Sequence, residues 1–196
     1  MQLSDLFSYT IVLNSSSPRR KQLLTDLGFK IKQVKTSVDE VYPKDIPVFD
    51  IPAYLSVQKA DAYKEIISDK EILLCSDTMV FLGETPLGKP IDKQEACNML
   101  KNLSNNVHTV VSACCLRHKN EERVFSQTTK VRFKPLSMEE IEYYVQTYSP
   151  LDKAGAYGIQ EWIGMIGIES IEGDFYNVMG LPTQRLFEQL LSITSL

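Results

Sequence analysis

The sequence contains few of the residues that build histidine-based or cysteine-based sites. Among its 196 residues are two histidines, His108 and His118, and four cysteines, at positions 75, 97, 114 and 115. The cysteines lack the spacing of a zinc site, and a chain of this length does not depend on disulfide bonds, so we expect reduced, mostly buried thiols. Two histidines leave little material for a zinc site or a Ser-His-Asp triad. Any metal chemistry is therefore expected to use carboxylates.

Long apolar runs and an excess of positive charge are also absent. The longest apolar runs, such as 72–75 and 79–82, are far too short to cross a bilayer. The N-terminus has no basic stretch of the kind that opens a secretory signal, so we expect a cytoplasmic protein with no membrane partner. With 21 Lys and Arg against 25 Asp and Glu, the net charge is −4. This balance argues against nucleic acid as a partner, and any anionic ligand must be met by a local cationic patch.

Two common nucleotide-binding motifs are missing as well. The segment 83–90 nearly forms a P-loop, but Pro90 stands where the magnesium-binding Ser or Thr is required. There is no G-x-G-x-x-G fingerprint for a dinucleotide. At 43% hydrophobic and 23% charged residues, the composition is that of an ordinary globular protein, and the length suits a single domain over 1–196.

The pattern of apolar residues predicts an α/β fold. Strands are expected at 9–14, 31–38, 72–82, 107–116, 124–133 and 162–168, the fourth and fifth forming a hairpin. Helices are expected at about 18–27, 53–67, 92–103 and 137–148, and from 183 onward. Ser17, Asp92 and Ser137 are the expected N-caps of three of these helices.

The first informative segment is the loop Ser15-Ser16-Ser17-Pro18-Arg19-Arg20-Lys21. Pro18 suits the first helical position, but three cations in a first turn oppose the helix dipole. Free amides and guanidinium groups at a helix N-terminus would together hold a phosphate. The alternative is a capped surface helix with solvated basic residues.

The second informative feature is a carboxylate inside an apolar strand. Asp77 would be costly there unless a cation, a metal or strong hydrogen bonds offset its desolvation; the alternative is a carboxylate that caps a strand end. Asp39 and Glu40 could complete an oxygen-ligand site for Mg²⁺ or Mn²⁺, or lie in a solvated turn. Lys59 lies on or beside the apolar face of its helix, and Lys89 lies between Gly88 and Pro90. Both could reach phosphate oxygens, although a snorkelling lysine is the simpler interpretation.

Two late glycine-bearing loops complete the set. The loop 152–160 mixes small and polar residues, as a backbone that closely approaches a ligand needs, or is a simple connector. The loop 173–182 could wall a pocket or only pack against other loops.

These segments, in this order, resemble the Maf family of nucleotide pyrophosphatases from Ile11 to about Leu190. Thr78 after the aspartate, and the run from Asp152 to Gln160, are similar to the subgroup that acts on dTTP and UTP. The departures are Glu161, where Gly is frequent, and Asp174, where Ser is frequent. The resemblance implies a mixed, elongated, twisted sheet flanked by helices, with the nucleotide in a cleft between two lobes, an architecture similar to inosine triphosphate pyrophosphatases. It also implies a homodimer.

The resemblance further implies the chemistry and its residues. A nucleoside triphosphate would be hydrolysed between the α and β phosphates with a divalent cation, Mg²⁺ or Mn²⁺. Asp77 would be the general base, or the ligand of the metal that activates water, with Glu40 sharing the metal. The triphosphate would be held by Ser15, Ser17, Arg19, Arg20, Lys59 and Lys89, and the base would be selected by Arg19, Thr78 and Gln160. Alternatives are a nucleotide-binding regulator of cell division with little turnover, and a pyrophosphatase for modified nucleotides.

Overall fold

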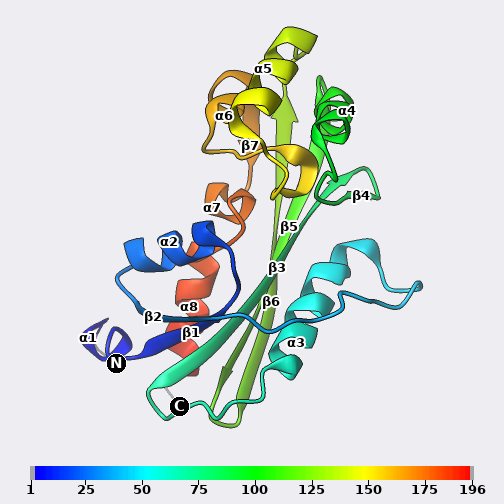
Figure 1. Ribbon diagram of the computed structural model, residues 1–196. Coiled ribbons are helices and arrows are strands. Elements are labelled where there is room, and N and C mark those ends of the chain that lie inside the picture. The colour runs from blue at the N-terminus through cyan, green and yellow to red at the C-terminus, as the bar shows by residue number, and fades with distance from the viewer. Residues whose placement is uncertain (1–2, 195–196) are drawn as a thin grey trace. The chain divides into compact units, whose positions relative to one another are not determined.

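The computed structural model describes residues 3–194 and contains a seven-stranded mixed sheet flanked by helices (Figure 1). The hydrogen-bonded strand order is β2-β1-β3-β5-β6-β7, and β4 pairs with β3. The strands are β1 Thr10–Asn14, β2 Lys30–Val34, β3 Glu71–Leu82, β4 Thr85–Leu87, β5 Val107–His118, β6 Glu121–Phe133 and β7 Ile168–Glu172. The helices are α1 Leu3–Leu6, α2 Pro18–Asp26, α3 Ile51–Ala62, α4 Lys93–Leu103, α5 Met138–Tyr148, α6 Trp162–Gly167, α7 Phe175–Val178 and α8 Thr183–Ile193, with 3₁₀ turns at Val48–Asp50 and Ala154–Ala156. The predicted α/β class is confirmed.

The chain divides into two compact units. The first unit consists of residues 1–77, 112–127 and 180–196, and the second of residues 78–111 and 128–179. The strands β3, β5 and β6 each contribute residues to both units.

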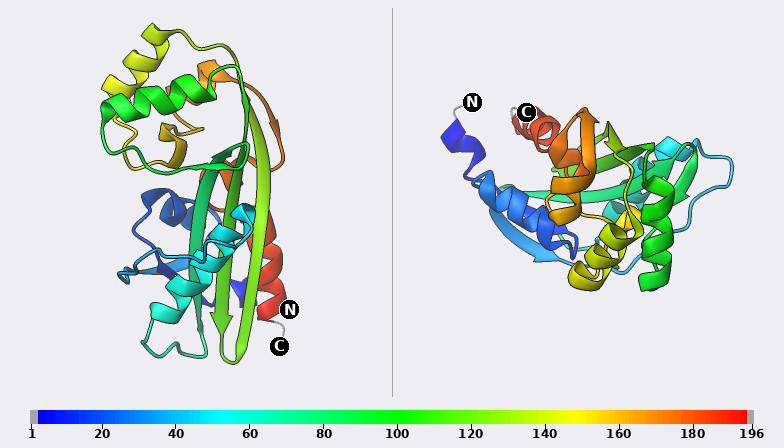
Figure 2. Two further views of the ribbon diagram at one scale, coloured as in Figure 1. Left: turned by 90° about the vertical axis from the view of Figure 1, so that its right-hand side faces the viewer. Right: turned by 90° about the horizontal axis from the view of Figure 1, so that it is seen from above.

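The first unit is organised around parallel strands. β1 pairs in parallel with β2 on one side and with β3 on the other. A core of Val12, Ala60, Leu73, Cys75 and Cys115 joins β1, α3, β3 and β5. Helices α3 and α8 lie on opposite faces of these strands, as two perpendicular views agree (Figures 1 and 2). Strands covered on both faces explain why 72–75 is an uninterrupted apolar run.

The second unit has its own core, in which α4 and α5 pack side by side (Figure 2). Both helices begin as predicted. The Asp92 side chain accepts a hydrogen bond from the Glu95 amide, and Ser137 and Glu140 form a reciprocal capping box. The apolar faces of the two helices bury Ala96, Leu100, Leu103, Ile141, Tyr144 and Val145.

One predicted strand was wrong, and another was predicted too long. Residues 162–167 form helix α6 instead of a strand, and the strand β7 follows it. Ile163 and Gly167 are buried while Met165 is 73% exposed, which is a helical and not an alternating pattern. A short apolar run does not distinguish the two structures by itself.

The second predicted strand, 31–38, ends at Val34. Its one neighbour among the described strands of the sheet is β1, and β1 ends at Asn14, which is paired with Val34. The following residues therefore have no strand to pair with.

None of the helices within residues 3–194 has the length and apolarity needed to cross a membrane.

Candidate active site

Most of the predicted site residues of the first unit gather where β1 ends. The chain runs from β1 through α2 to β2 on one side of β1, and then through α3 to β3 on its other side. The order of the strands therefore reverses at β1, and open α/β sheets bind ligands at the carboxyl ends of the strands where such a reversal occurs. The loop 15–17 starts at this point.

The loop is organised as the sequence predicts. Ser17 is the N-cap of α2, and its Oγ accepts a hydrogen bond from the Arg20 amide at 3.3 Å, while Pro18 takes the first helical position. Ser15 Oγ accepts from the Ser17 amide at 3.2 Å. Arg19, on the same first turn, is half-buried. This turn therefore brings a helix N-terminus and two arginine side chains together.

Arg20 has a second role that sequence reasoning missed. Its Nε donates to the carbonyl of Gly180 at 2.8 Å, and its Nη1 donates to the carbonyl of Ser76 at 2.7 Å and to Ser15 Oγ at 3.3 Å. Burial lowers the pKa of the guanidinium, and the negative charge of Asp77 opposes that shift. Arg20 thus fixes the backbone next to Asp77 as well as the loop 15–17.

The central feature of the first unit is a lysine between two carboxylates. The ammonium Nζ of Lys59 lies 2.5 Å from Oδ1 of Asp77 and 2.8 Å from Oε1 of Glu40. Asp77 is 8% exposed, and Glu40 is exposed. The structure therefore brings three predicted residues together from β3, α3 and the segment after β2. The predicted position of Lys59 beside the buried face of its helix is confirmed.

The carboxylates of Glu40 and Asp77 suit a divalent cation that is shared with a substrate. Glu40 and Asp77 both direct a carboxylate oxygen at the same Lys59 ammonium. No group of three or more Asp, Glu, His or Cys side chains in the described part of the chain could hold a metal. Mg²⁺ commonly takes one or two carboxylates and completes its shell with phosphate oxygens and water. Two converging carboxylates fit that mode of binding and do not form a closed protein cage.

The other three predicted residues belong to the second unit. Thr78 follows Asp77 in β3 and is half-buried, whereas Lys89 and Gln160 are exposed in loops. The Gly155 amide donates to the Gly88 carbonyl at 3.1 Å, which joins the loop 152–161 to the turn that carries Lys89. Gly155 has φ +69°, and a Cβ there would lie 3.0 Å from Val80, so this close approach requires glycine.

The loop 152–161 is held by a network around Glu161, for which the sequence offered no explanation. Glu161 Oε2 accepts a hydrogen bond from the Tyr144 hydroxyl, and Oε1 lies 3.1 Å from Lys153 Nζ. The Gly158 amide donates to the same tyrosine oxygen at 3.0 Å. Burial, followed by the Glu161 carboxylate, raises the pKa of Tyr144, which stays protonated and donates. Glu161 therefore organises this loop.

Asp174, the other departure from the family pattern, also has a structural role. Its side chain accepts from the Tyr176 amide at 2.8 Å and caps α7. Its backbone exchanges two hydrogen bonds with Thr129 Oγ1. It supports the loop 173–182.

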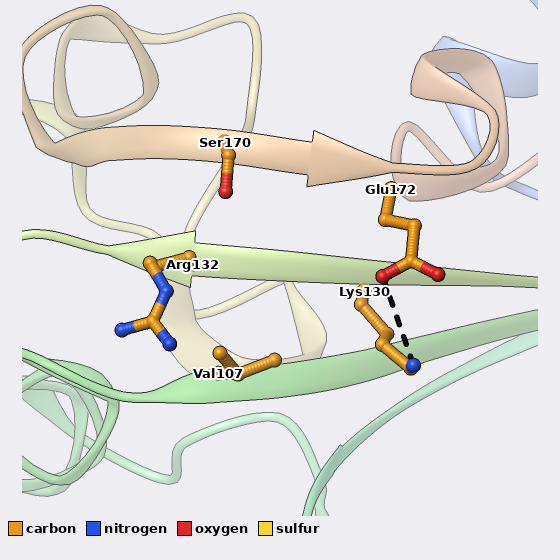
Figure 3. A pocket seen from close by; sticks show the side chains of 5 residues that line it. All are labelled: Val107, Lys130, Arg132, Ser170 and Glu172. Atoms are coloured by element: carbon orange, nitrogen blue, oxygen red, sulfur yellow. Dashed lines mark ion pairs between the residues drawn. The ribbon is translucent and has the colours of Figure 1, made fainter.

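A separate surface hollow of about 320 Å³ lies on the second unit, between β5, β6 and β7 (Figure 3). Its lining side chains are all exposed, and Lys130 and Glu172 form an ion pair across it at 3.7 Å. None of the residues predicted from the sequence lines it.

The comparisons with known proteins agree with the motifs. The sequence model of the family described as Maf-like protein matches residues 10–193. A protein of Bacteroides thetaiotaomicron named dTTP/UTP pyrophosphatase is 47% identical over 189 residues, covering 96% of this chain and 98% of its own length. A protein of the same name from Porphyromonas gingivalis is 47% identical over 191 residues, covering 96% of each chain.

Among solved structures, the Staphylococcus aureus Ham1 protein matches 92% of this chain and 99% of its own at a TM-score of 0.46 and 17% identity. The family match spans nearly the whole described chain, and the sequence relatives are similar from end to end. The chain belongs to the Maf family.

Proposed function

We propose that this chain is a nucleoside triphosphate pyrophosphatase that hydrolyses dTTP and UTP to the monophosphate and pyrophosphate. The observation that carries the proposal is the meeting of Glu40, Lys59 and Asp77 in the unit that carries the loop 15–17. The base preference is carried over from the relatives named dTTP/UTP pyrophosphatase. We further propose that the chain works in the cytoplasm as a homodimer and as a single functional domain.

The residues of the first unit have roles that follow from their surroundings, and Lys89, Thr78 and Gln160 of the second unit have roles that follow from the family resemblance. Water attacks one phosphorus of the α–β anhydride and Asp77 takes a proton of that water, while the bridging P–O bond breaks and releases the monophosphate and pyrophosphate. Lys59 fixes one Asp77 oxygen and supplies positive charge near the phosphates. Ser15, Ser17, Arg19 and Arg20 bind the triphosphate through the N-terminal turn of α2, and Lys89 adds a further cation. Arg19, Thr78 and Gln160 select the base.

A divalent cation completes the proposal. Glu40 and Asp77 would hold Mg²⁺ or Mn²⁺, which supplies neutralisation of phosphate charge and polarisation of water. The cation would share the two carboxylates with the Lys59 ammonium.

The test is pyrophosphate release from dTTP, UTP, CTP, GTP and 7-methyl-GTP with Mg²⁺ or Mn²⁺. We expect dTTP and UTP to be the best substrates, and Asp77→Asn to lower kcat by ~10³-fold, within the range for loss of a general base. Asp69→Asn is the matched control, because it removes the same charge from an exposed residue of the same unit. A thermal melt of both variants checks that they are folded.

The outcomes separate the parts of the proposal. Release confined to a purine nucleotide would overturn the base preference and keep the chemistry. Release that survives Asp77→Asn at the level of the Asp69→Asn control would remove Asp77 from its role. No release from any nucleotide would contradict the pyrophosphatase function.

A further inference from the structure

A buried asparagine connects the segments that carry Lys59 and Glu40. Asn14, the last residue of β1, is 5% exposed. Its side-chain Nδ2 donates to the carbonyl of Lys59 at 3.0 Å, and its Oδ1 accepts from the amide of Thr36 at 2.9 Å. One amide group therefore bonds simultaneously to α3 and to the segment after β2.

The Lys59 carbonyl accepts this hydrogen bond in place of one from its own helix. Lys59 lies in the last turn of α3, which ends at Ala62, and Tyr63 continues in an extended conformation. The last four carbonyls of a helix have no helical amide to accept from. An acceptor left without a partner in a buried place is costly, so the bond from Asn14 fixes where the end of this helix lies.

The bond from Thr36 to Asn14 fixes the segment that leads to Glu40, the second carboxylate paired with Lys59. Thr36 lies two residues beyond the end of β2, in the irregular segment that leads to Glu40. This segment has no strand partner, as described above. The Asn14 carbonyl oxygen gives its backbone a fixed anchor at the carboxyl end of β1.

We propose that Asn14 is a positioning residue, which places the Lys59 ammonium between Asp77 and Glu40; the proposal rests on the function proposed above. Only a short side chain that carries both a donor and an acceptor can make these two bonds from one position. The substitution Asn14→Asp would keep the acceptor for Thr36 and lose the donor to Lys59. The substitution Asn14→Ala would lose both bonds.

These two substitutions test the proposal, with Asn177→Ala as the matched control. Asn177 is a buried asparagine of the second unit that donates to the Val110 carbonyl at 3.1 Å and to Thr129 Oγ1 at 2.9 Å. Its loss removes comparable bonds away from Lys59, so it reports the effect of a buried amide on stability alone. If Asn14→Ala does not fold, the nearly isosteric Asn14→Asp carries the test.

The first readout needs no catalysis. Reductive methylation with formaldehyde and a borane, followed by peptide mass spectrometry, measures how readily the Lys59 amine reacts. We expect Lys59 to react several-fold faster in both Asn14 variants than in the wild type and in Asn177→Ala. An unchanged Lys59 rate would overturn the proposal, whatever the enzymatic activity.

The second readout is the kinetics with dTTP. A misplacement of about 1 Å can lower catalysis by ~10²-fold, so we expect kcat to fall ~10–100-fold in both Asn14 variants, with KM changed far less. Asn177→Ala should keep the wild-type kcat below its melting temperature. Wild-type kcat in Asn14→Asp would show that the bond to Lys59 is not what matters and would overturn the proposal. A wild-type protein that releases no pyrophosphate contradicts the proposed function, whereas the methylation readout still decides the role of Asn14.

Discussion

The two units each contain a shielded lysine that lies between two carboxylates, but the two arrangements are built differently. Lys59 pairs with Glu40 and Asp77, and its side chain is 17% exposed; Lys153 pairs with Asp152 and Glu161, and its side chain is 9% exposed. The residues around Lys59 come from three separate segments of the chain. Those around Lys153 all come from one loop of ten residues, 152–161.

This difference distinguishes the proposed active site from a cluster that supports a loop. Glu161 also accepts from Tyr144, which in turn accepts from the Gly158 amide, so the charges of the second unit tie one loop to helix α5. The Lys59 cluster stands instead at the end of β1, where the sheet topology favours ligand binding. A lysine between two carboxylates is therefore not enough to identify an active site; its place in the fold decides.

The largest expected difference is between Lys59→Met and Lys153→Met. Loss of a preorganised charge lowers kcat by ~10²–10³-fold, which we expect for Lys59→Met, and because Asp77 is 8% exposed the same change should lower the free energy of unfolding by about 3 kcal/mol or less. Arg20 still compensates part of the Asp77 charge in that variant. Lys153→Met leaves Glu161 without its cation and should lower the free energy of unfolding by about 3 kcal/mol while kcat stays within several-fold. Urea unfolding and dTTP kinetics on both variants measure this. Loss of activity in Lys153→Met without loss of stability would contradict this distinction between the two lysines.

Removal of divalent cations should affect activity and not the folded state. Glu40 and Asp77 already have a cationic partner in Lys59, so the metal is not required to hold the first unit together. We expect EDTA to abolish pyrophosphate release and to leave the melting temperature unchanged, and added Mg²⁺ to restore activity. A large drop in melting temperature with EDTA would indicate a structural metal, since a cation that binds the folded chain tightly stabilises it.

The sequence predicted the local parts of the site well. The cap at Ser17, the position of Asp77 in an apolar strand and the face of Lys59 all follow from spacing and periodicity, because each depends on neighbours within a few residues. The pairing of Lys59 with Glu40 and Asp77 depends on how distant segments meet, and no periodicity encodes it.

The roles of Asn14 and Glu161 were missed for the same reason. Asn14 ends a strand and gives no signal of its bond to a helix 45 residues later. Glu161 appeared only as a departure from the family pattern, because its partner Tyr144 lies on the preceding helix. A polar residue at the end of a buried strand is the one local signal that could have indicated Asn14.

Acid should weaken the second unit through His108. This histidine is 1% exposed, its Nε2 lies 2.7 Å from the Tyr157 hydroxyl, and burial lowers its pKa to about 4. Between pH 4 and pH 6.5 the unfolded chain binds more protons than the folded chain, because the histidine pKa in the unfolded chain is near 6.5. The free energy of unfolding therefore falls as the pH falls from 6.5 to 4, by about 3 kcal/mol in total from this residue.

Trp162, the one tryptophan, reports this effect because it belongs to the second unit. Urea unfolding followed by its fluorescence at pH 7 and pH 4.5 should show the loss. His108→Gln cannot take up the proton and should therefore show a smaller dependence on pH. An equal pH dependence in the two proteins would remove His108 from this role.

The smallest expected effect is a difference in the reactivity of cysteine thiols between the two units, which has no consequence for function. Cys75, Cys114 and Cys115 are buried in the first unit, and burial raises their pKa values to about 11, 12 and 12. Cys97, on α4 of the second unit, is only half-buried. Because the thiolate is the reactive form, a disulfide reagent at pH 8 should modify Cys97 first, and Cys97→Ser should remove that first phase. The other three thiols should react only when the first unit opens, so their rate measures the stability of the unit that carries Asp77. Rapid reaction of more than one thiol in the folded protein would show that this unit is less tightly closed than its packing indicates.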